Sequence, residues 1–290
     1  MALVTAAILP HGFPLIPRLS DDADGAMATR QAMEEAGRRF REAGVEAIVL
    51  AGPHGIRVDG FMCVADVGRA AGTLTLRDRG VEMNVPCDRP LIESIGRACR
   101  ERDIPVAMAG FGGNRADQAV APMDWGAMTP LWFTGHHRHV ESFGNVLASA
   151  PEGDAGPPVV LITPSRALPR PMMVDFGRAL ADVFAADERK IGFIASCDWG
   201  HCHRDDGPYG YNAKSAEVDE KVVAAVKAND LLGLIDLPEQ DVQAAAIDGL
   251  WQTLMLAGVQ EVTPLDVGFL SYEVPSYYSM IVAAYAPAGQ

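Results

Sequence analysis

Three histidines follow apolar runs of the chain, where their side chains could bind a metal ion or transfer a proton. The segments ILPHG, LAGPHG and IASCDWGH place His11, His54 and His201 at the ends of predicted buried strands. Neutral imidazole is the commonest protein ligand for transition metals, and it exchanges protons near neutral pH. One such histidine alone is explained as well by a hydrogen bond within its own loop. Three of the chain's seven histidines at equivalent positions favour a shared site.

The stretch SCDWGHCHRDDGPYGYN, residues 196–212, concentrates histidines, cysteines and acids. It is compatible with a metal site, an acid/base site or a polar loop. We interpret it as a strand end followed by an active-site loop, with His201 as the working residue. His203 points either to the pocket or to solvent, and Asp198 either orients His201 or caps the loop. Tyr209 either donates a hydrogen bond to a substrate oxygen or packs at the rim of the pocket.

The elements around these residues alternate between buried strands and amphipathic helices. LVTAAILP, VEAIVLAGP, IPVAMAG, PPVVLITPS, KIGFIASCDWG and SYYSMIVAAYAP predict strands, and GFMCVADVGRAAGTLTL predicts an inserted hairpin. Helical spacing of apolar residues predicts helices over 26–43, 89–102, 171–186, 215–230 and 239–258. We therefore expect an α/β fold: a single domain over residues 1–290, with a mostly parallel central sheet flanked by helices. In such folds ligands bind at the carboxyl ends of the strands.

The composition narrows the class of protein. The chain has 290 residues, 49% of them hydrophobic, which is enough for a large core. A formal net charge of −14 argues against nucleic acid or an anionic membrane as a partner. Five cysteines without a CxxC motif indicate a reducing compartment, and the N-terminal apolar run lacks the basic residues of a signal peptide. We expect a cytoplasmic protein that forms a homo-oligomer.

Taken together, the motifs resemble class III extradiol ring-cleavage dioxygenases, the LigB-type superfamily that also contains Memo-like proteins. The resemblance rests on ILPHG, on AGPHG about forty residues later, on an S-x-D-x-x-H strand end and on a late helix, and it covers nearly the whole chain. It implies that His11 and His54 bind Fe(II) and that His201 is an acid/base residue. The third ligand of the family is normally a Glu followed by Gly. The matching position, in AAIDGLW, is Asp248.

The chain departs from the family pattern at two positions. Asp248 is one methylene shorter than Glu, so its backbone must lie closer to the ion or its carboxylate must bind differently. In the segment DWG, Trp125 occupies the place of a family histidine that assists catalysis. Tryptophan has no basic nitrogen, so this proton-transfer role is missing or is supplied elsewhere. Candidates to supply it, which are otherwise exposed loop residues, are His136, His137 and His139.

The resemblance implies an enzyme that uses Fe(II) and O2 to open the ring of a catechol-type or phenolic acid substrate. Two histidines and one carboxylate leave open positions on the metal for both reactants, and Mn(II) or Zn(II) would suit the same ligands. His201 would take a proton from a substrate hydroxyl and later return one, while Trp125 and Tyr209 would contact a small aromatic or cyclic substrate. Two alternatives stay open: an oxygen-independent, metal-dependent C–C hydrolase of a cyclic diketone, and a Memo-like non-catalytic binding protein.

Overall fold

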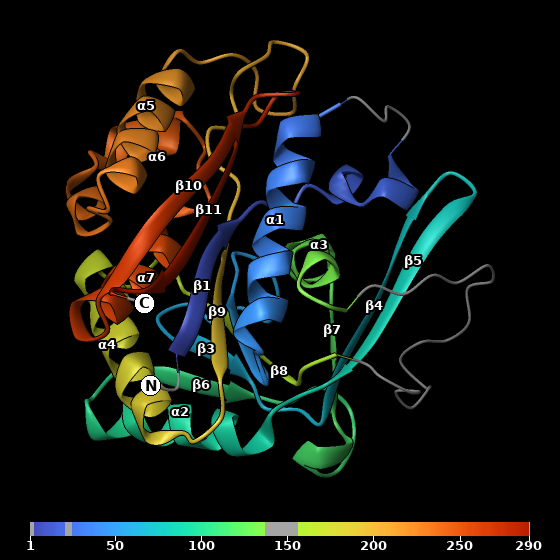
Figure 1. The fold of residues 1–290 in the computed structure, drawn as a ribbon, viewed down its shortest axis with the longest axis vertical. Coiled ribbons are helices and arrows are strands. Elements are labelled where there is room, and N and C mark those ends of the chain that lie inside the picture. Colours follow the sequence, from blue (N-terminus) through green and yellow to red (C-terminus); the bar gives the residue numbers. More distant parts are fainter. Residues whose placement is uncertain (1–2, 21–24, 137–155, 290) are drawn as a thin grey trace.

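An eight-stranded sheet forms the centre of the molecule in the computed structural model, which describes residues 3–20, 25–136 and 156–289 (Figure 1). Its strands follow the order β10-β11-β1-β9-β2-β8-β3-β6. In chain order they are β1 Leu3–Leu9, β2 Ala47–Ala51, β3 Met62–Ala65, β6 Val106–Ala109, β8 Val159–Thr163, β9 Ile191–Ser196, β10 Leu265–Glu273 and β11 Met280–Pro287. Four of the seven neighbouring pairs are parallel, so the expected α/β fold with a mostly parallel sheet is confirmed.

The histidine-bearing strands lie side by side in the middle of this sheet. β9 runs between β1 and β2 and is parallel to both, with Leu9 opposite Ser196 and Ala51 opposite Ala195. All residues of β2 and β9 are buried, which explains their continuous apolar sequences. Because the three strands end at the same edge, the loops that follow them converge there.

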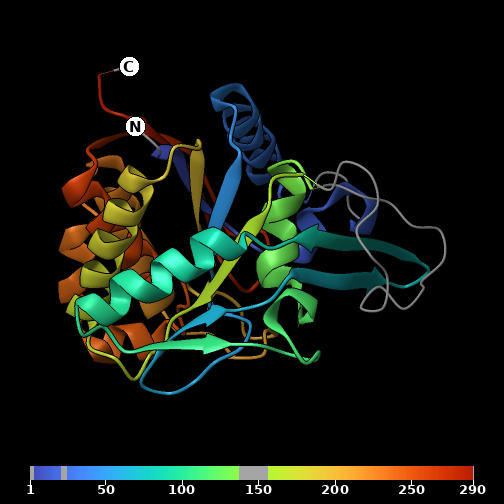
Figure 2. The ribbon, with the colours of Figure 1, turned by 90° about the horizontal axis from the view of Figure 1, so that it is seen from below.

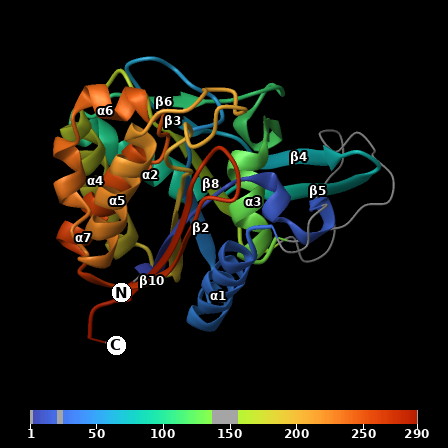
Figure 3. The ribbon, with the colours of Figure 1, turned by 90° about the horizontal axis from the view of Figure 1, so that it is seen from above.

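Helices cover both faces of the sheet. The described helices are α1 Met27–Ala43, α2 Arg89–Glu101, α3 Trp125–Phe133, α4 Arg170–Ala186, α5 Lys214–Lys227, α6 Glu239–Ala244 and α7 Leu250–Val262. Figures 2 and 3 show α4 and α7 together on one side, with α1 and α3 on the other. None of the helices in the described part of the chain is both long enough and apolar enough to traverse a bilayer.

The predicted hairpin in GFMCVADVGRAAGTLTL was wrong in its pairing. β3 is fully buried and joins the main sheet between β8 and β6. The hairpin is formed instead by β4 Arg69–Leu76 and β5 Arg79–Pro86, which pair with β7 Val120–Pro122 in a separate three-stranded sheet. A two-residue turn with Arg77 at a φ of 57° closes it. Figure 1 shows this arm extending from the body of the molecule.

The predicted helix over residues 239–258 was also wrong, because the chain forms two helices there with a turn between them. α6 ends at Ala244 and α7 begins at Leu250, and Ala246 in the turn has a φ of 49°. A Cβ atom on Gly249 would lie 2.5 Å from Cys197 Cβ, so glycine permits the turn to approach the end of β9. Asp248 therefore lies in a turn at the edge of the sheet, not on a helix.

Candidate metal centre and active-site cleft

The three residues expected to bind metal meet at the carboxyl edge of the sheet. One ligand atom from each of His11, His54 and Asp248 lies within 4.8 Å of the other two. His11 and His54 come from the loops after β1 and β2, and Asp248 comes from the turn between α6 and α7. The structure thus brings together residues that are up to 237 positions apart in the sequence.

His11 is fully enclosed and surrounded by acidic groups. Its Nδ1 lies 3.1 Å from the Ser196 hydroxyl, which donates its own proton to the Gly126 carbonyl and therefore accepts from the imidazole. Its Nε2 lies 3.4 Å from Oδ2 of Asp198 and 3.4 Å from Oδ2 of Asp248. Burial alone would lower the pKa of His11, but the two carboxylates raise it to about 9. A strongly negative environment of this kind favours a cation.

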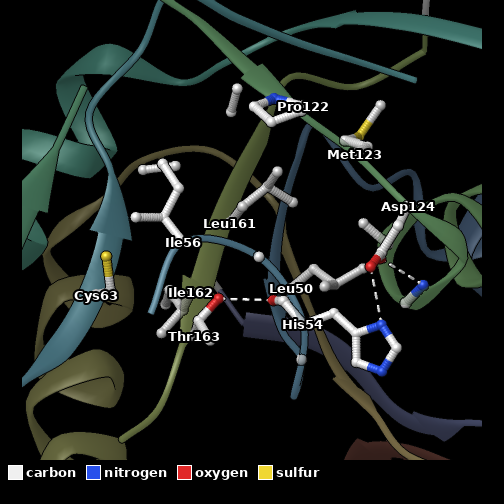
Figure 4. Close-up of a pocket in the computed structure, with 16 residues that line it drawn as sticks. Leu50, His54, Ile56, Cys63, Pro122, Met123, Asp124, Leu161, Ile162 and Thr163 are labelled. Atoms are coloured by element: carbon white, nitrogen blue, oxygen red, sulfur yellow. Dashed lines mark hydrogen bonds and ion pairs between the residues drawn. The ribbon is translucent and has the colours of Figure 1, made fainter. Parts of the chain in front are cut away.

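The first turn of α3 contacts the His54 ring on its Nδ1 side. Its Nδ1 lies 2.9 Å from Oδ2 of Asp124, whose Oδ1 accepts the Gly126 N–H and caps the helix (Figure 4). Burial raises the pKa of Asp124, but the hydrogen bond and charge of His54, together with the Gly126 N–H, outweigh burial, so the pKa is lowered. A Cβ on Gly126 would come within 2.9 Å of the His54 ring, so glycine lets the helix start against it.

The loop that carries His54 also lines a small cavity of about 30 Å³, which is drawn in Figure 4. Leu50, Ile56 and Leu161 are among the residues that line it. The Thr163 hydroxyl donates a 2.7 Å hydrogen bond to the His54 carbonyl across this region. The position of His54 is thus fixed through its backbone as well as through its ring.

Asp248 reaches the histidines because its turn lies against the end of β9. Its Oδ1 accepts the Asp198 N–H at 2.9 Å, and its Oδ2 faces Nε2 of His11. Burial raises the pKa of Asp248, but attraction from His11 and then from His201 outweighs burial, so the pKa is lowered. The side chain of Asp248 is one methylene shorter than the family's Glu, and the backbone of Asp248 lies correspondingly close to the site.

Asp198 contacts His11, although the sequence had suggested that it orients His201 or caps the loop. Its Oδ1 accepts the backbone N–H of His11 at 3.1 Å, and its side chain is almost fully buried. Burial, together with repulsion from Asp248, raises the pKa of Asp198. Asp198 thus holds the loop after β1 in place and adds to the negative charge around His11.

His201 lies beside the three proposed ligands but outside their group. Its Nε2 is 3.9 Å from Oδ2 of Asp248, and its Nδ1 is buried and has no hydrogen-bond partner within the described residues. Its ring stacks on Tyr278, with centroids 5.7 Å apart, and meets the edge of Tyr209 at 5.7 Å. The aromatic rings fix the plane of the imidazole without occupying its nitrogens.

His203 faces neither the cleft nor bulk solvent, so neither sequence interpretation was right. Its Nε2 lies 2.8 Å from Oδ2 of Asp219 on α5, which also accepts a hydrogen bond from the Tyr272 hydroxyl. The other oxygen of Asp219 accepts the Gly200 N–H. His203 therefore helps to anchor the loop that carries His201.

Two cavities meet over the proposed metal ligands and form one cleft. Both are lined by His54, His201, Tyr209 and Asp248. The aromatic half, of about 410 Å³, adds Trp125, Tyr277 and Tyr278. The arginine half, of about 400 Å³, adds Arg166, Gln243 and Trp251.

Trp125 and Tyr209, the two predicted substrate contacts, both line this cleft. The Trp125 ring meets the His54 ring edge-on at 5.0 Å and is 42% exposed, and Tyr209 is 62% exposed. Both side chains are thus accessible to a ligand. Whether they contact substrate stays a prediction.

His136 lies away from the cleft and cannot replace the missing family histidine from there. It is buried, with its Nε2 2.7 Å from the Pro157 carbonyl, and it lines neither half of the cleft. His137 and His139 lie outside the described residues.

Sequence reasoning missed several residues that shape the site. Arg166 follows β8 at the same edge as the histidines, so the rule that selected them would have found it. Tyr277 and Tyr278 precede β11 and were treated only as part of a strand. Ser196, which contacts His11, has no signal in the sequence, because a serine at the end of a buried strand is common.

Comparison with known proteins places the chain in a family. Residues 5–282 match the family described as the catalytic LigB subunit of aromatic ring-opening dioxygenase, and the chain belongs to this family. Protein CA_C1420 of Clostridium acetobutylicum is 23% identical over 275 residues, which are 94% of this chain. The chain spans 55% of the length of that relative.

A solved structure has a similar fold. The crystal structure of an uncharacterized protein, JW3007, from Escherichia coli K12 superposes with a TM-score of 0.57 at 15% sequence identity. The alignment covers 97% of this chain and 99% of that one. At this identity the similarity concerns the fold alone.

Proposed function

We propose that this protein is a metal-dependent dioxygenase that opens the ring of a catechol-type or phenolic acid substrate. The observation that carries the proposal is the convergence of His11, His54 and Asp248 within 4.8 Å at the floor of a cleft. Membership of the LigB family supports a dioxygenase-type enzyme at the level of the superfamily. His201, at the wall of the same cleft, is the proposed acid/base residue.

The donor atoms fit a divalent ion. Metal bonds to imidazole nitrogen and carboxylate oxygen are about 2.0–2.2 Å long, so ligands of one ion lie within about 4.4 Å of each other. The observed limit of 4.8 Å requires only a small contraction. The Nδ1 atoms of His11 and His54 face Ser196 and Asp124, which leaves each Nε2 for the ion. Two imidazoles and one carboxylate favour Fe(II), and Mn(II) or Zn(II) accept the same set.

The residues of the cleft have separate roles in this proposal. When bound, a divalent iron would lower the pKa of the substrate hydroxyls and hold the reactants close together. His201 accepts a proton from a substrate hydroxyl and returns it to the product, and stacking on Tyr278 keeps its ring in place for both steps. Trp125 provides a flat wall that excludes water and suits an aromatic ring.

Oxygen consumption tests this function. The protein is loaded anaerobically with Fe(II) and mixed with catechol-type and phenolic acids, and O2 uptake and the absorbance of the ring-opened product are recorded together. We expect one O2 consumed for each ring opened. Conversion of a substrate without O2 uptake would contradict the proposal.

One observation favours a second candidate, an oxygen-independent hydrolase of a C–C bond in a cyclic diketone. Trp125 stands where the family has a second proton-transfer residue, and it offers one N–H donor and no basic nitrogen. His201 would then act on a water molecule instead of on a substrate hydroxyl. Anaerobic turnover with incorporation of oxygen from labelled water distinguishes this reaction. A protein that binds no metal would instead fit a Memo-like binding role.

A further inference from the structure

Arg166 presents a positive charge to the cleft of a strongly acidic protein. It follows β8 and lines the arginine half together with His54, Asp248 and Trp251. Its guanidinium carbon lies 4.5 Å from the centre of the Trp251 ring, at the start of α7. The residue is exposed as a whole, yet protein atoms surround its guanidinium closely enough that burial lowers its pKa. Arginine nevertheless remains charged at any physiological pH.

The guanidinium has no hydrogen-bond or ion-pair partner within the described residues. The acidic groups of this half are already engaged. Glu239 pairs with Arg170 at 2.7 Å, and Asp248 is a proposed metal ligand. Asp248 attracts Arg166, but its carboxylate oxygens face His11 and the Asp198 N–H, so the guanidinium keeps its hydrogen-bond donors for an anion.

The backbone that carries Arg166 is fixed relative to the proposed metal ligands. The Ser165 hydroxyl accepts hydrogen bonds from the N–H groups of Gly60, at 2.9 Å, and Ala167, at 3.2 Å. Thr163, three residues before Arg166, donates to the His54 carbonyl at 2.7 Å. The loops after β2 and β8 are thus joined at two points. Stacking on Trp251 limits the guanidinium to one wall of the cleft.

We infer that Arg166 binds a carboxylate on the substrate. The inference rests on the proposed function and narrows its substrate to an aromatic acid. The ring would lie over the proposed ligands, and its acidic substituent would extend into the arginine half. A planar guanidinium matches the two oxygens of a carboxylate, and its contact with Trp251 leaves its edge free for them. A neutral catechol would leave the positive charge of Arg166 without a partner.

The test compares two ligands that differ in charge. Phenylacetate and phenylacetamide have the same ring and similar shapes, and neither has the adjacent hydroxyls that a metal would chelate. Isothermal titration calorimetry measures the binding of both to the full chain at low salt, as purified and with added Zn(II). We expect wild type to prefer phenylacetate by about 10- to 100-fold, the usual value of a charge-assisted hydrogen bond.

Arg166→Gln should remove this preference, and Arg166→Lys should keep part of it. Arg97→Gln is the matched control. Arg97, on α2, is exposed, lines neither half of the cleft and has no hydrogen bond or ion pair among the described residues. This variant changes the net charge equally and should bind both ligands as wild type does.

Equal affinities of wild type for the two ligands would overturn the inference, and so would a preference that survives in Arg166→Gln. A separate titration of Mn(II) into the same proteins measures metal binding and so tests the proposed function itself. Wild type and Arg166→Gln should both bind one equivalent, because Arg166 is not a ligand. Absence of Mn(II) binding by wild type would refute the metal-dependent function, while the charge preference would still be decided by the metal-free titrations.

Discussion

His11 and His54 follow neighbouring parallel strands, yet the protein holds them in opposite ways. The His11 side chain is 2% exposed, its Nδ1 meets a neutral serine hydroxyl, and its Nε2 faces two carboxylates. The His54 side chain is 25% exposed, and its Nδ1 lies 2.9 Å from the carboxylate of Asp124, behind the ring. His11 is therefore part of a buried charge cluster, whereas His54 is a partly exposed residue oriented by the cap of a helix.

The difference arises from what each loop packs against. Asp198, at the end of β9, contacts both the backbone and the ring of His11. A Cβ on Gly12 would lie 2.1 Å from the Tyr278 hydroxyl, which shows how closely this loop is packed. His54 instead packs against the first turn of α3 on one side and lines the cleft on the other. We therefore predict that His11 contributes to stability as well as to the proposed metal site, and that His54 contributes to the proposed metal site alone.

The largest expected effect concerns His201, which lies near Asp248 but is not one of the proposed ligands. His201→Ala should retain the metal and lower the rate of substrate conversion by roughly 10²- to 10⁴-fold, the usual contribution of a positioned acid/base group. Metal analysis and steady-state kinetics on the same preparation measure both quantities. Loss of metal in this variant would make His201 a ligand and would call Asp248 into question.

Stability separates His11 from His54. His11→Ala removes the imidazole that lies between the buried carboxylates of Asp198 and Asp248, so the free energy of unfolding should fall by roughly 3–5 kcal/mol. The His54–Asp124 pair is partly exposed, and His54→Ala should cost about 1 kcal/mol or less. Urea denaturation in EDTA measures both values without a contribution from bound metal. Equal losses in the two variants would remove the distinction between the two histidines.

Asp124→Asn tests the orientation of the His54 ring. Asparagine still caps α3 with its side-chain oxygen, so its amide N–H group faces Nδ1 of His54. This favours the His54 tautomer with the proton on Nε2, the nitrogen proposed to bind the metal. Metal affinity should fall about 10- to 100-fold, as measured by Mn(II) titration. Asp205→Asn, on the exposed surface, is the matched control and should leave the affinity unchanged. An unchanged affinity in Asp124→Asn would mean that this carboxylate does not orient the ligand.

The smallest expected effect is a gain. Trp125→His places a basic nitrogen beside His54 and opposite His201, within the aromatic half of the cleft. Wild type should cleave simple catechols weakly, and the variant should cleave them faster, by about tenfold, which is below the usual contribution of a positioned acid/base group. Product absorbance with catechol and protocatechuate measures the change. Rapid cleavage by wild type, unaffected by the substitution, would contradict this role for Trp125.

The fold was largely predictable because its signals are local. Long apolar runs marked the buried strands, and α1 and α2 were predicted within two residues of their observed bounds. The hairpin partner was not predictable, because β3 pairs with β8 and β6, which come from distant parts of the sequence, instead of with the adjacent β4. Likewise, helical spacing continues through residues 239–258, and only the contact of Gly249 with Cys197 shows the turn.

The site residues that could be predicted from the sequence are those that directly follow a predicted strand. His11, His54 and His201 each follow a strand, and the family resemblance added Asp248. The partners of these residues were harder to predict, because they depend on which loops face each other. Arg166 is near His54 through hydrogen bonds between two loops that are about a hundred residues apart.

Metal stoichiometry tests the central claim most directly. Wild type and His54→Ala are stripped with chelator and titrated anaerobically with Fe(II), and bound metal is measured by calorimetry and elemental analysis. His54 contributes little to stability on this account, so any loss of binding reflects a lost ligand and not an unfolded protein. We predict one equivalent in wild type and none in His54→Ala. One equivalent bound by His54→Ala at wild-type affinity would contradict the assignment of His11, His54 and Asp248 as the metal centre.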